Sequence, residues 1–430
     1  MVSPHTVTAG QASSFTHDVA IIGLGYVGLP TALTFHAAGA RVLGVDVSER
    51  RLDDIRAERV DLLDSDRVRL TEALSGDALE LTASVAAASS AAAMVICVPT
   101  PVTEELSPDL RALKGACAAA VEHAVPGQVL ILTSTTYVGC TEDLLVRPLR
   151  ERGLEIGTDV FVAFSPERID PGNDRHAHED VPRVVGGTTE RCTAAASKVL
   201  SRYNRHIHEV SGSGVAEMSK LLENTFRAVN IAMANEFANA SRQLGIDIME
   251  VIDAAATKPY GFMPFYPGPG AGGHCIPCDP HYLLWQMRKE RVVMNVVENA
   301  MNDIAMRPGE VVHRVRELLS DHGKGLRGAK VLVLGVAYKP GVEDIRESPA
   351  LEIIERLLDA GADVSFHDQL IQEVTIRGRK MTSVDLETVD VDLVLAHTPQ
   401  RGGTSAWIKP GQLVLDATYR MAGLAGRHAL

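Results

Sequence analysis

The chain has 430 residues, which is enough for two or three domains with cores of their own. Its 42 basic and 55 acidic residues give a net charge of −13, which argues against a nucleic-acid binder or a protein held on an anionic membrane. No apolar run approaches the ~20 residues of a membrane span, and six cysteines are too few for a disulfide scaffold. The first residues also lack the pattern of a secretion signal, so we expect a cytoplasmic protein.

The first part of the chain alternates apolar strands with helical stretches. Residues 18–22 form an apolar run, followed by the turn GLGYVG, a helical stretch and a second strand that ends at Asp46. Further strands are predicted at 93–98, 128–134 and 160–165. Strands alternating with helices predict an α/β fold with a parallel, doubly wound sheet.

The middle of the chain has a different character. A helical pattern runs over 213–256 and is broken only at Gly245, and a Gly- and Pro-rich loop covers 259–280. The α/β pattern resumes near residue 306. A long apolar stripe on the helix favours a domain-linking or dimer-forming element. The stripe consists of Met218, Leu222, Phe226, Val229, Met233 and Phe237.

The turn after the first strand carries the pattern Gly23-x-Gly25-x-x-Gly28. Such a pattern is weak alone, but here it follows a strand and opens a helix. Glycines permit the tight turn and let a pyrophosphate approach the free N–H groups of the helix N-terminus. The turn therefore predicts a dinucleotide site, with a ligand-free βαβ turn as the alternative.

Asp46 follows the second strand, where a carboxylate accepts hydrogen bonds from the adenosine ribose. The same charge repels a 2′-phosphate, so we expect NAD rather than NADP. Arg50 and Arg51 lie close by in the sequence, and a guanidinium there is a feature that accommodates the phosphate of NADP.

The loop before residue 280 presents Cys275 after four glycines, and a cysteine in such a loop is a candidate nucleophile. Cys275 and Cys278 also match a redox Cys-x-x-Cys pattern, but that motif requires a preceding strand and a helix that begins at the first cysteine. A structural zinc site would need a second ligand pair at the right spacing. Whether the two thiols form a regulatory disulfide stays open.

Two polar clusters have ordinary explanations from spacing alone. Lys220 and Asn224 lie four residues apart, and Arg227 extends their row, as on a solvated helix face. Histidines and acids over 176–180 could hold a metal, but a His-rich surface loop is commoner. We therefore predict no metal.

Several long segments, taken in order, resemble the UDP-glucose/GDP-mannose dehydrogenase family of NAD-dependent nucleotide-sugar 6-dehydrogenases. The resemblance covers most of residues 18–420. The segments that carry it are IIGLGYVGLP (21–30), VPTP (98–101), STTYVG (134–139), FSPERIDPGN (164–173), EMSKLLENTFRAVNIAMANE (217–236), PGPGAGGHCIPCDP (267–280) and LGVAYKPGVEDIRESPA (334–350).

The resemblance implies a four-electron oxidation of the sugar C6 hydroxymethyl group to a carboxylate, with two NAD and one water. It implies that Cys275 carries the thiohemiacetal and thioester, that Lys220 and Asn224 stabilise developing oxyanions, and that Asp279 holds a water or the lysine. The positions implied around the reacting carbon and the hydrolytic water are Glu167 and Thr135.

Binding residues follow from the same resemblance. The implied cofactor-binding positions are Gly23, Gly25, Tyr26, Val27, Gly28, Asp46, Arg51, Thr100, Ser134, Thr135 and Arg346. The implied substrate-binding positions are Glu167, Arg168, Ile169, Lys220, Asn224, Arg227, Tyr266, Gly272, Tyr338 and Lys339.

The predicted organisation has four segments and a homodimer, or a higher homo-oligomer, as the assembly. The segments are a flexible tail (1–17), an NAD-binding Rossmann domain (18–210), a helical dimerisation domain with the cysteine loop (211–305) and a UDP-binding Rossmann-like domain (306–430). The central helix is expected to form the dimer.

The expected substrate is UDP-N-acetylglucosamine, because SPERIDPGN and the FYPGPG…GGHCIP loop resemble the branch that oxidises UDP-N-acetylhexosamines. UDP-glucose and UDP-N-acetylmannosamine are close alternatives. Family members often place a basic residue of the partner subunit near positions 259–261, where this chain has Lys258 just before. Two other classes remain open. A two-electron hydroxyacid-type dehydrogenase would have no use for Cys275, and a non-catalytic NAD- or UDP-sugar-binding regulator would need no catalytic set.

Overall fold

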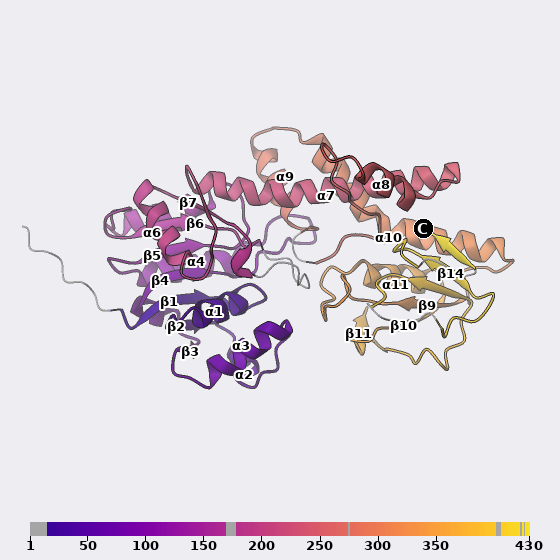
Figure 1. Cartoon of the computed structure of the whole chain (residues 1–430), viewed down its shortest axis with the longest axis horizontal. Helices are drawn as coiled ribbons and strands as arrows, with labels where there is room; N and C mark the ends of the chain where they lie inside the picture. Colours follow the sequence, from indigo (N-terminus) through magenta and orange to yellow (C-terminus); the bar gives the residue numbers. More distant parts are fainter. Residues whose placement is uncertain (1–14, 169–177, 274–275, 401–405, 422–423, 425) are drawn as a thin grey trace, which may run out of the picture. The chain divides into compact units, whose positions relative to one another are not determined.

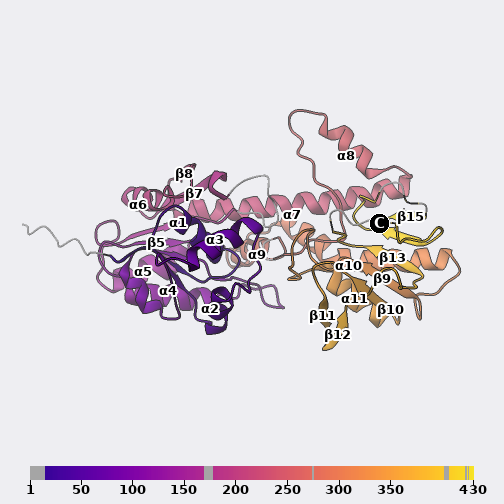
Figure 2. The ribbon, with the colours of Figure 1, turned by 60° about the horizontal axis from the view of Figure 1, so that its bottom comes forward.

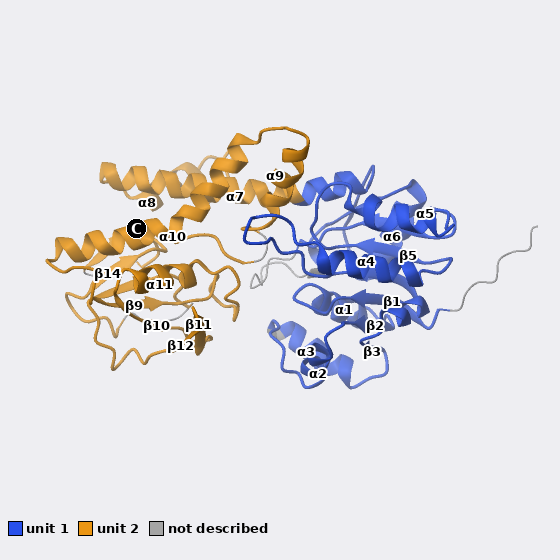
Figure 3. Ribbon diagram, turned by 180° about the vertical axis from the view of Figure 1, so that it is seen from behind, with its two compact units in different colours: residues 1–220 blue, residues 221–430 orange. Residues whose placement is uncertain are grey.

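The computed structural model describes residues 15–168, 178–273, 276–400, 406–421, 424 and 426–430. The chain forms two compact units, residues 1–220 and 221–430 (Figure 3). The boundary falls inside one long helix, α7 (Ser213–Leu244), which both ribbon views follow along its length (Figures 1 and 2). Each unit is described by itself.

The first unit is built on an eight-stranded sheet with the order β3-β2-β1-β4-β5-β6-β7-β8. Neighbouring strands from β3 to β6 run parallel, β7 is antiparallel to β6, and β8 is parallel to β7. The strands are β1 (His17–Ile22), β2 (Val42–Val45), β3 (Leu79–Thr82), β4 (Ala91–Ile96), β5 (Val129–Leu132), β6 (Phe161–Phe164), β7 (Arg183–Gly187) and β8 (Ile207–Val210).

Helices cover both faces of this sheet, because successive strand residues alternate between two apolar cores. Val19 and Ile21 of β1 pack with α1, α2, α3 and α6, whereas Ala20 and Ile22 pack with α4, η2 and α5. The elements are α1 (Gly28–Ala37), α2 (Glu49–Arg56), α3 (Asp64–Leu74), η1 (Val85–Ser90), α4 (Arg111–His123), the π-helical η2 (Glu142–Val146), α5 (Arg147–Glu151), η3 (His178–Asp180) and α6 (Glu190–Leu200).

The predicted long helix and its break are confirmed. Gly245 has φ +70° and separates α7 from α8 (Ile248–Ala256). After the Gly- and Pro-rich loop come α9 (Asp279–Lys289) and α10 (Asn295–Asp321). Residue 306 lies inside α10, and the predicted domain boundaries stay a prediction.

The second unit contains a five-stranded, fully parallel sheet with the order β10-β9-β13-β14-β15. Its strands are β9 (Lys330–Leu334), β10 (Asp363–His367), β13 (Leu393–Ala396), β14 (Leu413–Asp416) and β15 (Arg427–Ala429). An antiparallel hairpin pairs β11 (Glu373–Ile376) with β12 (Arg379–Thr382), and α11 (Pro349–Asp359) packs in the core with α10. The predicted α/β fold with two Rossmann-like sheets and a helical middle is confirmed.

Candidate active site

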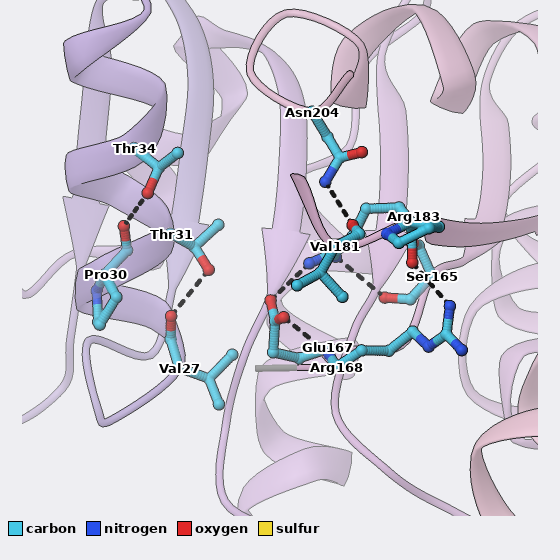
Figure 4. A network of polar contacts seen from close by, with 11 residues as sticks. Val27, Pro30, Thr31, Thr34, Ser165, Glu167, Arg168, Val181, Arg183 and Asn204 are labelled. Carbon is cyan, nitrogen blue, oxygen red and sulfur yellow. Dashed lines mark hydrogen bonds and ion pairs between the residues drawn. The ribbon is translucent and has the colours of Figure 1, made fainter. Parts of the chain in front are cut away.

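The glycine turn fits a dinucleotide. Gly23 has φ +91°, a conformation that favours glycine, and a Cβ on Gly28 would lie 1.7 Å from the Gly23 carbonyl oxygen. A Cβ on Gly25 would have no heavy atom within 4 Å, so the backbone there is open on the outside. Val27 precedes α1, and its carbonyl accepts the Thr31 hydroxyl at 2.8 Å (Figure 4). Residues 23–28 would hold the pyrophosphate of the dinucleotide at the start of α1.

Asp46 lies at the end of β2 and is half-buried. Its Oδ2 accepts the Leu24 N–H at 2.9 Å and its Oδ1 accepts the Ser48 N–H at 2.9 Å. Arg51 donates from Nε to the Leu24 carbonyl at 2.9 Å, so part of its guanidinium holds the turn. Tyr26 is exposed and donates to Asp61 at 3.1 Å. A carboxylate at the strand end suits the two ribose hydroxyls of the cofactor.

The ends of β4 and β5 place three further predicted residues. Ser134 is buried and donates from Oγ to the Val98 carbonyl at 2.8 Å, which ties the two strand ends together. Thr135 next to it is half-buried, and Thr100 is buried. Ligands of doubly wound sheets bind at the carboxyl ends of the strands, which is where these residues lie.

Glu167 follows β6 and has both oxygens engaged (Figure 4). Oε1 accepts the Arg168 N–H at 2.7 Å, and Oε2 accepts Nη1 of Arg183, the first residue of β7, at 2.5 Å. Arg168 donates from Nη1 to the Pro182 carbonyl at 2.7 Å. Ile169 lies outside the described residues. Arg183 was missed by the sequence analysis, although an arginine that opens an otherwise apolar strand signals a buried acidic partner.

Lys220 is buried on α7, and a residue three positions earlier explains how that part of the helix is held. Glu217 accepts the Gly139 N–H at 2.6 Å, the Thr141 N–H at 2.9 Å and the Thr141 hydroxyl at 2.7 Å. Burial raises the pKa of Glu217, while these donors act to lower it. The Glu217 carboxylate therefore binds the end of STTYVG and the residues just after it to the helix that carries Lys220.

In the second unit, Asn224 of α7 donates a short hydrogen bond from Nδ2 to Asp279, the first residue of α9. Asp279 is 1% exposed, so this buried carboxylate depends on its partners. Cys278 is also buried. Cys275 lies outside the described residues, and its assignment as nucleophile stays a prediction.

The glycines that precede the cysteine are packed against protein. A Cβ on Gly272 would lie 2.6 Å from the Glu347 carbonyl oxygen, and one on Gly273 would lie 2.9 Å from the Tyr338 ring. The Gly273 N–H donates to the Arg346 carbonyl at 3.1 Å. The loop therefore needs glycines chiefly in order to lie on the segment that follows β9.

The start of this loop is fixed from two helices. The Gly268 N–H donates to Asn235 of α7 at 2.9 Å, and its carbonyl accepts Nε of Arg307 of α10, also at 2.9 Å. Arg307 is 1% exposed and also donates to Asn239 and to the Tyr419 hydroxyl. The sequence analysis did not predict the role of Arg307, because the residues that it contacts lie far apart in the chain.

The remaining predicted binding residues divide by their surroundings. The Arg346 guanidinium is paired with Asp344, with contacts of 2.7 to 3.1 Å. Tyr338 and Lys339 are half-buried, and Arg227 is exposed. Tyr266 is partly exposed and lies 5.9 Å from the Arg420 guanidinium.

The predicted surface loop near residue 178 engages in ion pairs. Glu179 pairs with Arg69 at 3.2 Å, and Asp180 pairs with Arg205 at 3.1 Å. Among the described residues, no group of three or more His, Cys, Asp or Glu side chains is arranged to hold a metal. His176 lies outside those residues. In the same described part of the chain, no helix is long and apolar enough to cross a membrane.

Comparison with known families shows which family the chain belongs to. Residues 17–204 match the NAD binding domain of the UDP-glucose/GDP-mannose dehydrogenase family, residues 214–303 its central domain and residues 332–418 its UDP binding domain. The chain belongs to this family. It is an NAD-dependent UDP-sugar dehydrogenase, an oxidoreductase, which confirms the predicted family and cofactor.

Individual relatives span nearly the whole chain. UDP-N-acetyl-D-mannosamine dehydrogenase of Methanocaldococcus jannaschii is 32% identical, over 91% of this chain and 88% of the relative. The solved UDP-N-acetylmannosamine dehydrogenase of Pyrococcus horikoshii covers 96% of this chain and 98% of its own, with a TM-score of 0.87 and 30% identity. A UDP-glucose dehydrogenase from Pyrobaculum islandicum covers 97% and 96%, with a TM-score of 0.81 and 27% identity.

Proposed function

We propose that this enzyme oxidises the C6 hydroxymethyl group of UDP-N-acetylmannosamine to a carboxylate in two successive two-electron steps. The names of the relatives favour this sugar, which the sequence analysis gave as an alternative, over UDP-N-acetylglucosamine. UDP-glucose is the second candidate, favoured by the likeness to the Pyrobaculum enzyme. The balanced reaction consumes one sugar alcohol, two NAD and one water, and releases the carboxylate, two NADH and three protons.

The observation that carries the proposal is the hydrogen bond from Asn224 to the buried carboxylate of Asp279. It fixes the end of the cysteine loop, four residues after Cys275, to the helix that also carries Lys220 one turn earlier. A simple two-electron dehydrogenase has no need of a cysteine loop, whereas oxidation of an aldehyde needs a nucleophile that forms a tetrahedral adduct.

The residues of the chain divide the chemistry between them. When bound, NAD supplies the acceptor for the hydride removed from C6. The ammonium of Lys220 and the amide of Asn224 donate hydrogen bonds to the oxygen that becomes negative at C6. The Cys275 thiolate adds to the aldehyde to form a thiohemiacetal, and oxidation of that adduct gives a thioester. Glu167 and Thr135 orient the water that hydrolyses the thioester to the carboxylate and restores the thiol.

We further propose a homodimer formed through α7. In the single chain, several apolar side chains of this helix are exposed. Their exposed fractions include 64% for Leu222, 58% for Phe237 and 72% for Leu244. Contiguous apolar exposure on one helix is typical of a surface that a second copy covers. A cytoplasmic location fits the cytosolic supply of NAD and nucleotide sugars.

The experiment is a panel of UDP-sugars in which NADH is counted per sugar consumed. UDP-N-acetylmannosamine is expected to give the highest kcat/KM and two NADH per sugar. One NADH per sugar would indicate the two-electron class, and none with any sugar would indicate a binding protein. A preference for UDP-glucose or UDP-N-acetylglucosamine would overturn the choice of sugar but not the reaction.

A single substitution tests the covalent step within the same assay. Cys275→Ser should give at most a slow, roughly stoichiometric pulse of NADH, because a serine hydroxyl is almost wholly protonated at neutral pH and an alkoxide leaves poorly. Lys220→Ala should slow both oxidations. Sustained acid formation by Cys275→Ser within about tenfold of the parent rate would rule out the thioester route.

A further inference from the structure

Arg183 is a buried cation that the mechanism above does not use. It opens β7, its side chain is 1% exposed, and its N–H donates to the carbonyl of His206, the residue before β8, at 2.8 Å. A buried ion pair is on average no more stabilising than apolar residues of the same volume. Stability alone therefore does not explain a guanidinium at this position.

The guanidinium takes part in a closed ring of contacts with Glu167 (Figure 4). Arg183 Nη1 donates to Glu167 Oε2 at 2.5 Å, and Nη2 lies 3.4 Å from the Ser165 carbonyl. The Arg168 N–H donates to Glu167 Oε1, and the Arg168 side chain donates to the Pro182 carbonyl next to Arg183. Residues 167–168 and residues 182–183 are thus joined by two contacts, the ion pair and the hydrogen bond from the Arg168 side chain.

The strand entry is fixed from the other side as well. Asn204 donates from Nδ2 to the Val181 carbonyl at 2.8 Å, and its Oδ1 accepts the His206 N–H at 2.9 Å. The backbone carbonyls of the two residues before Arg183, Val181 and Pro182, therefore both accept side-chain hydrogen bonds. These contacts restrict the orientation of the Arg183 guanidinium. They therefore also restrict the Glu167 carboxylate that it binds.

Arg183 forms an ion pair with Glu167 at 2.5 Å, and two other ionisable side chains near this pair, Cys97 and Tyr203, are neutral. Burial raises the pKa of Cys97 to about 12, and burial also raises the pKa of Tyr203 above its ordinary value. Both therefore stay protonated at neutral pH. Although burial opposes the charge, Glu167 raises the pKa of Arg183. The pair therefore consists of two opposite charges with two neutral ionisable side chains, Cys97 and Tyr203, beside it.

We propose that Arg183 is a positioning residue that keeps Glu167 ionised and fixes the direction of its carboxylate toward the water of the hydrolytic step. This role rests on the proposed function of Glu167. A carboxylate held by a guanidinium accepts hydrogen bonds and stays charged, whereas a buried carboxyl without that cation becomes protonated and turns one oxygen into a donor.

The test compares Arg183→Met and Arg183→Lys with the parent in full pH profiles of kcat and kcat/KM. Arg183→Met should lower kcat about tenfold or more and move the acid limb to higher pH by on the order of one unit, with little change in the KM for NAD. Arg183→Lys keeps the charge and should recover part of both effects. Arg202→Met is the matched control, because Arg202 forms an ion pair with Asp18 at 2.7 Å but is about half exposed.

A double-mutant cycle separates positioning from mere folding. In a Glu167→Gln background, which has no carboxylate to position, Arg183→Met should change kcat less than about twofold and should not move the acid limb. If Arg183→Met does not fold, as judged by thermal melting, the same cycle is run with Arg183→Lys. A fall in kcat with an unmoved acid limb, or effects that add fully to those of Glu167→Gln, would overturn the proposal.

The parent enzyme distinguishes the two levels of inference. If the parent makes no NADH with any UDP-sugar, the proposed function fails before any variant is compared. If the parent turns over normally and the Arg183 variants match Arg202→Met, the proposed function stands and the positioning role is wrong.

Discussion

The two Rossmann-like sheets build the same turn after their first strand and use it differently. In the first unit, Gly23 has φ +91° and donates to the Val45 carbonyl at 2.8 Å. In the second, Gly335 has φ +83° and donates to the His367 carbonyl, also at 2.8 Å. In each sheet this contact joins the turn to the end of the neighbouring strand.

A carboxylate follows that neighbouring strand in both sheets. Asp46 accepts the Leu24 N–H at 2.9 Å, and Asp368 accepts the Val336 N–H at 2.8 Å. The second oxygen of each accepts an N–H two residues further on, at 2.9 Å. The same hydrogen-bond arrangement therefore occurs in both sheets, although the glycine pattern of the first turn is not repeated in the second.

The two turns differ in how accessible the carboxylate is and in where the next helix begins. Asp46 is half-buried, whereas Asp368 is 1% exposed and also lies near Ala337, Ile371 and Gln400. Helix α1 begins five residues after Gly23, but α11 begins fourteen residues after Gly335. The first turn thus combines a half-buried carboxylate with a helix N-terminus, two features that dinucleotide-binding turns use. The second uses its carboxylate to anchor an inserted segment.

The largest expected effect comes from removing the enclosed carboxylate. Asp368→Ala should lower the free energy of unfolding by about 3 kcal/mol, because several buried N–H groups lose their acceptor. Asp46→Ala should cost about 1 kcal/mol or less, since water can replace the carboxylate at a half-buried site. Urea unfolding of both variants measures the difference. Equal losses would mean that the two carboxylates do the same work.

The sequence was most informative where function and local pattern coincide. The glycine turn, the strand ending at Asp46 and the break at Gly245 were all predicted, because each has a short-range cause: a φ that favours glycine, or an apolar period. Asp368 is just as regular in structure, but nothing near it in the sequence marks its role.

Partnerships over long separations were not predictable in the same way. Glu167 and Arg183 meet through an antiparallel pair of strands, and Arg307 joins Gly268 to Tyr419 across more than a hundred residues. Family resemblance supplied Glu167, but the partner that sets its charge came only from the fold. The packing of the cysteine-loop glycines against Tyr338 likewise required the structure.

An acid-stability measurement sharpens the comparison, because the strands next to the two turns end differently. Cys97 follows β4 and His397 follows β13, each donating its N–H to the strand before the turn. Burial lowers the pKa of His397 to about 3. The unfolded chain therefore binds a proton between about pH 6.5 and pH 3 that the folded chain does not, and stability falls as the pH falls through this window.

His397→Gln should remove this acid sensitivity. Between pH 7 and pH 5 the parent should lose about 2 kcal/mol more than the variant in the free energy of unfolding of the second unit. Cys97→Ser is the control, because a thiol with a pKa of about 12 binds no additional proton in this range. Parallel loss in His397→Gln and the parent would show that another group carries the acid sensitivity.

The smallest expected effect concerns the choice of cofactor and returns to Asp46. The carboxylate repels a 2′-phosphate, so the parent should prefer NAD, and Asp46→Ala should narrow the ratio of kcat/KM for NAD over NADP by roughly tenfold, or about 1.4 kcal/mol. The two nearby arginines are not equivalent. Arg51 already donates to the Leu24 carbonyl, whereas the Arg50 side chain is 93% exposed. Arg50 pairs with Asp54 at 3.8 Å but is the more accessible of the two guanidinium groups. Arg50→Ala added to Asp46→Ala should therefore lower kcat/KM for NADP without changing that for NAD. Asp368→Ala should leave the ratio at the parent value, since its carboxylate is buried and accepts backbone N–H groups of its own unit. Equal kcat/KM for both cofactors in the parent would show that the exposed edge of Asp46 does not select NAD.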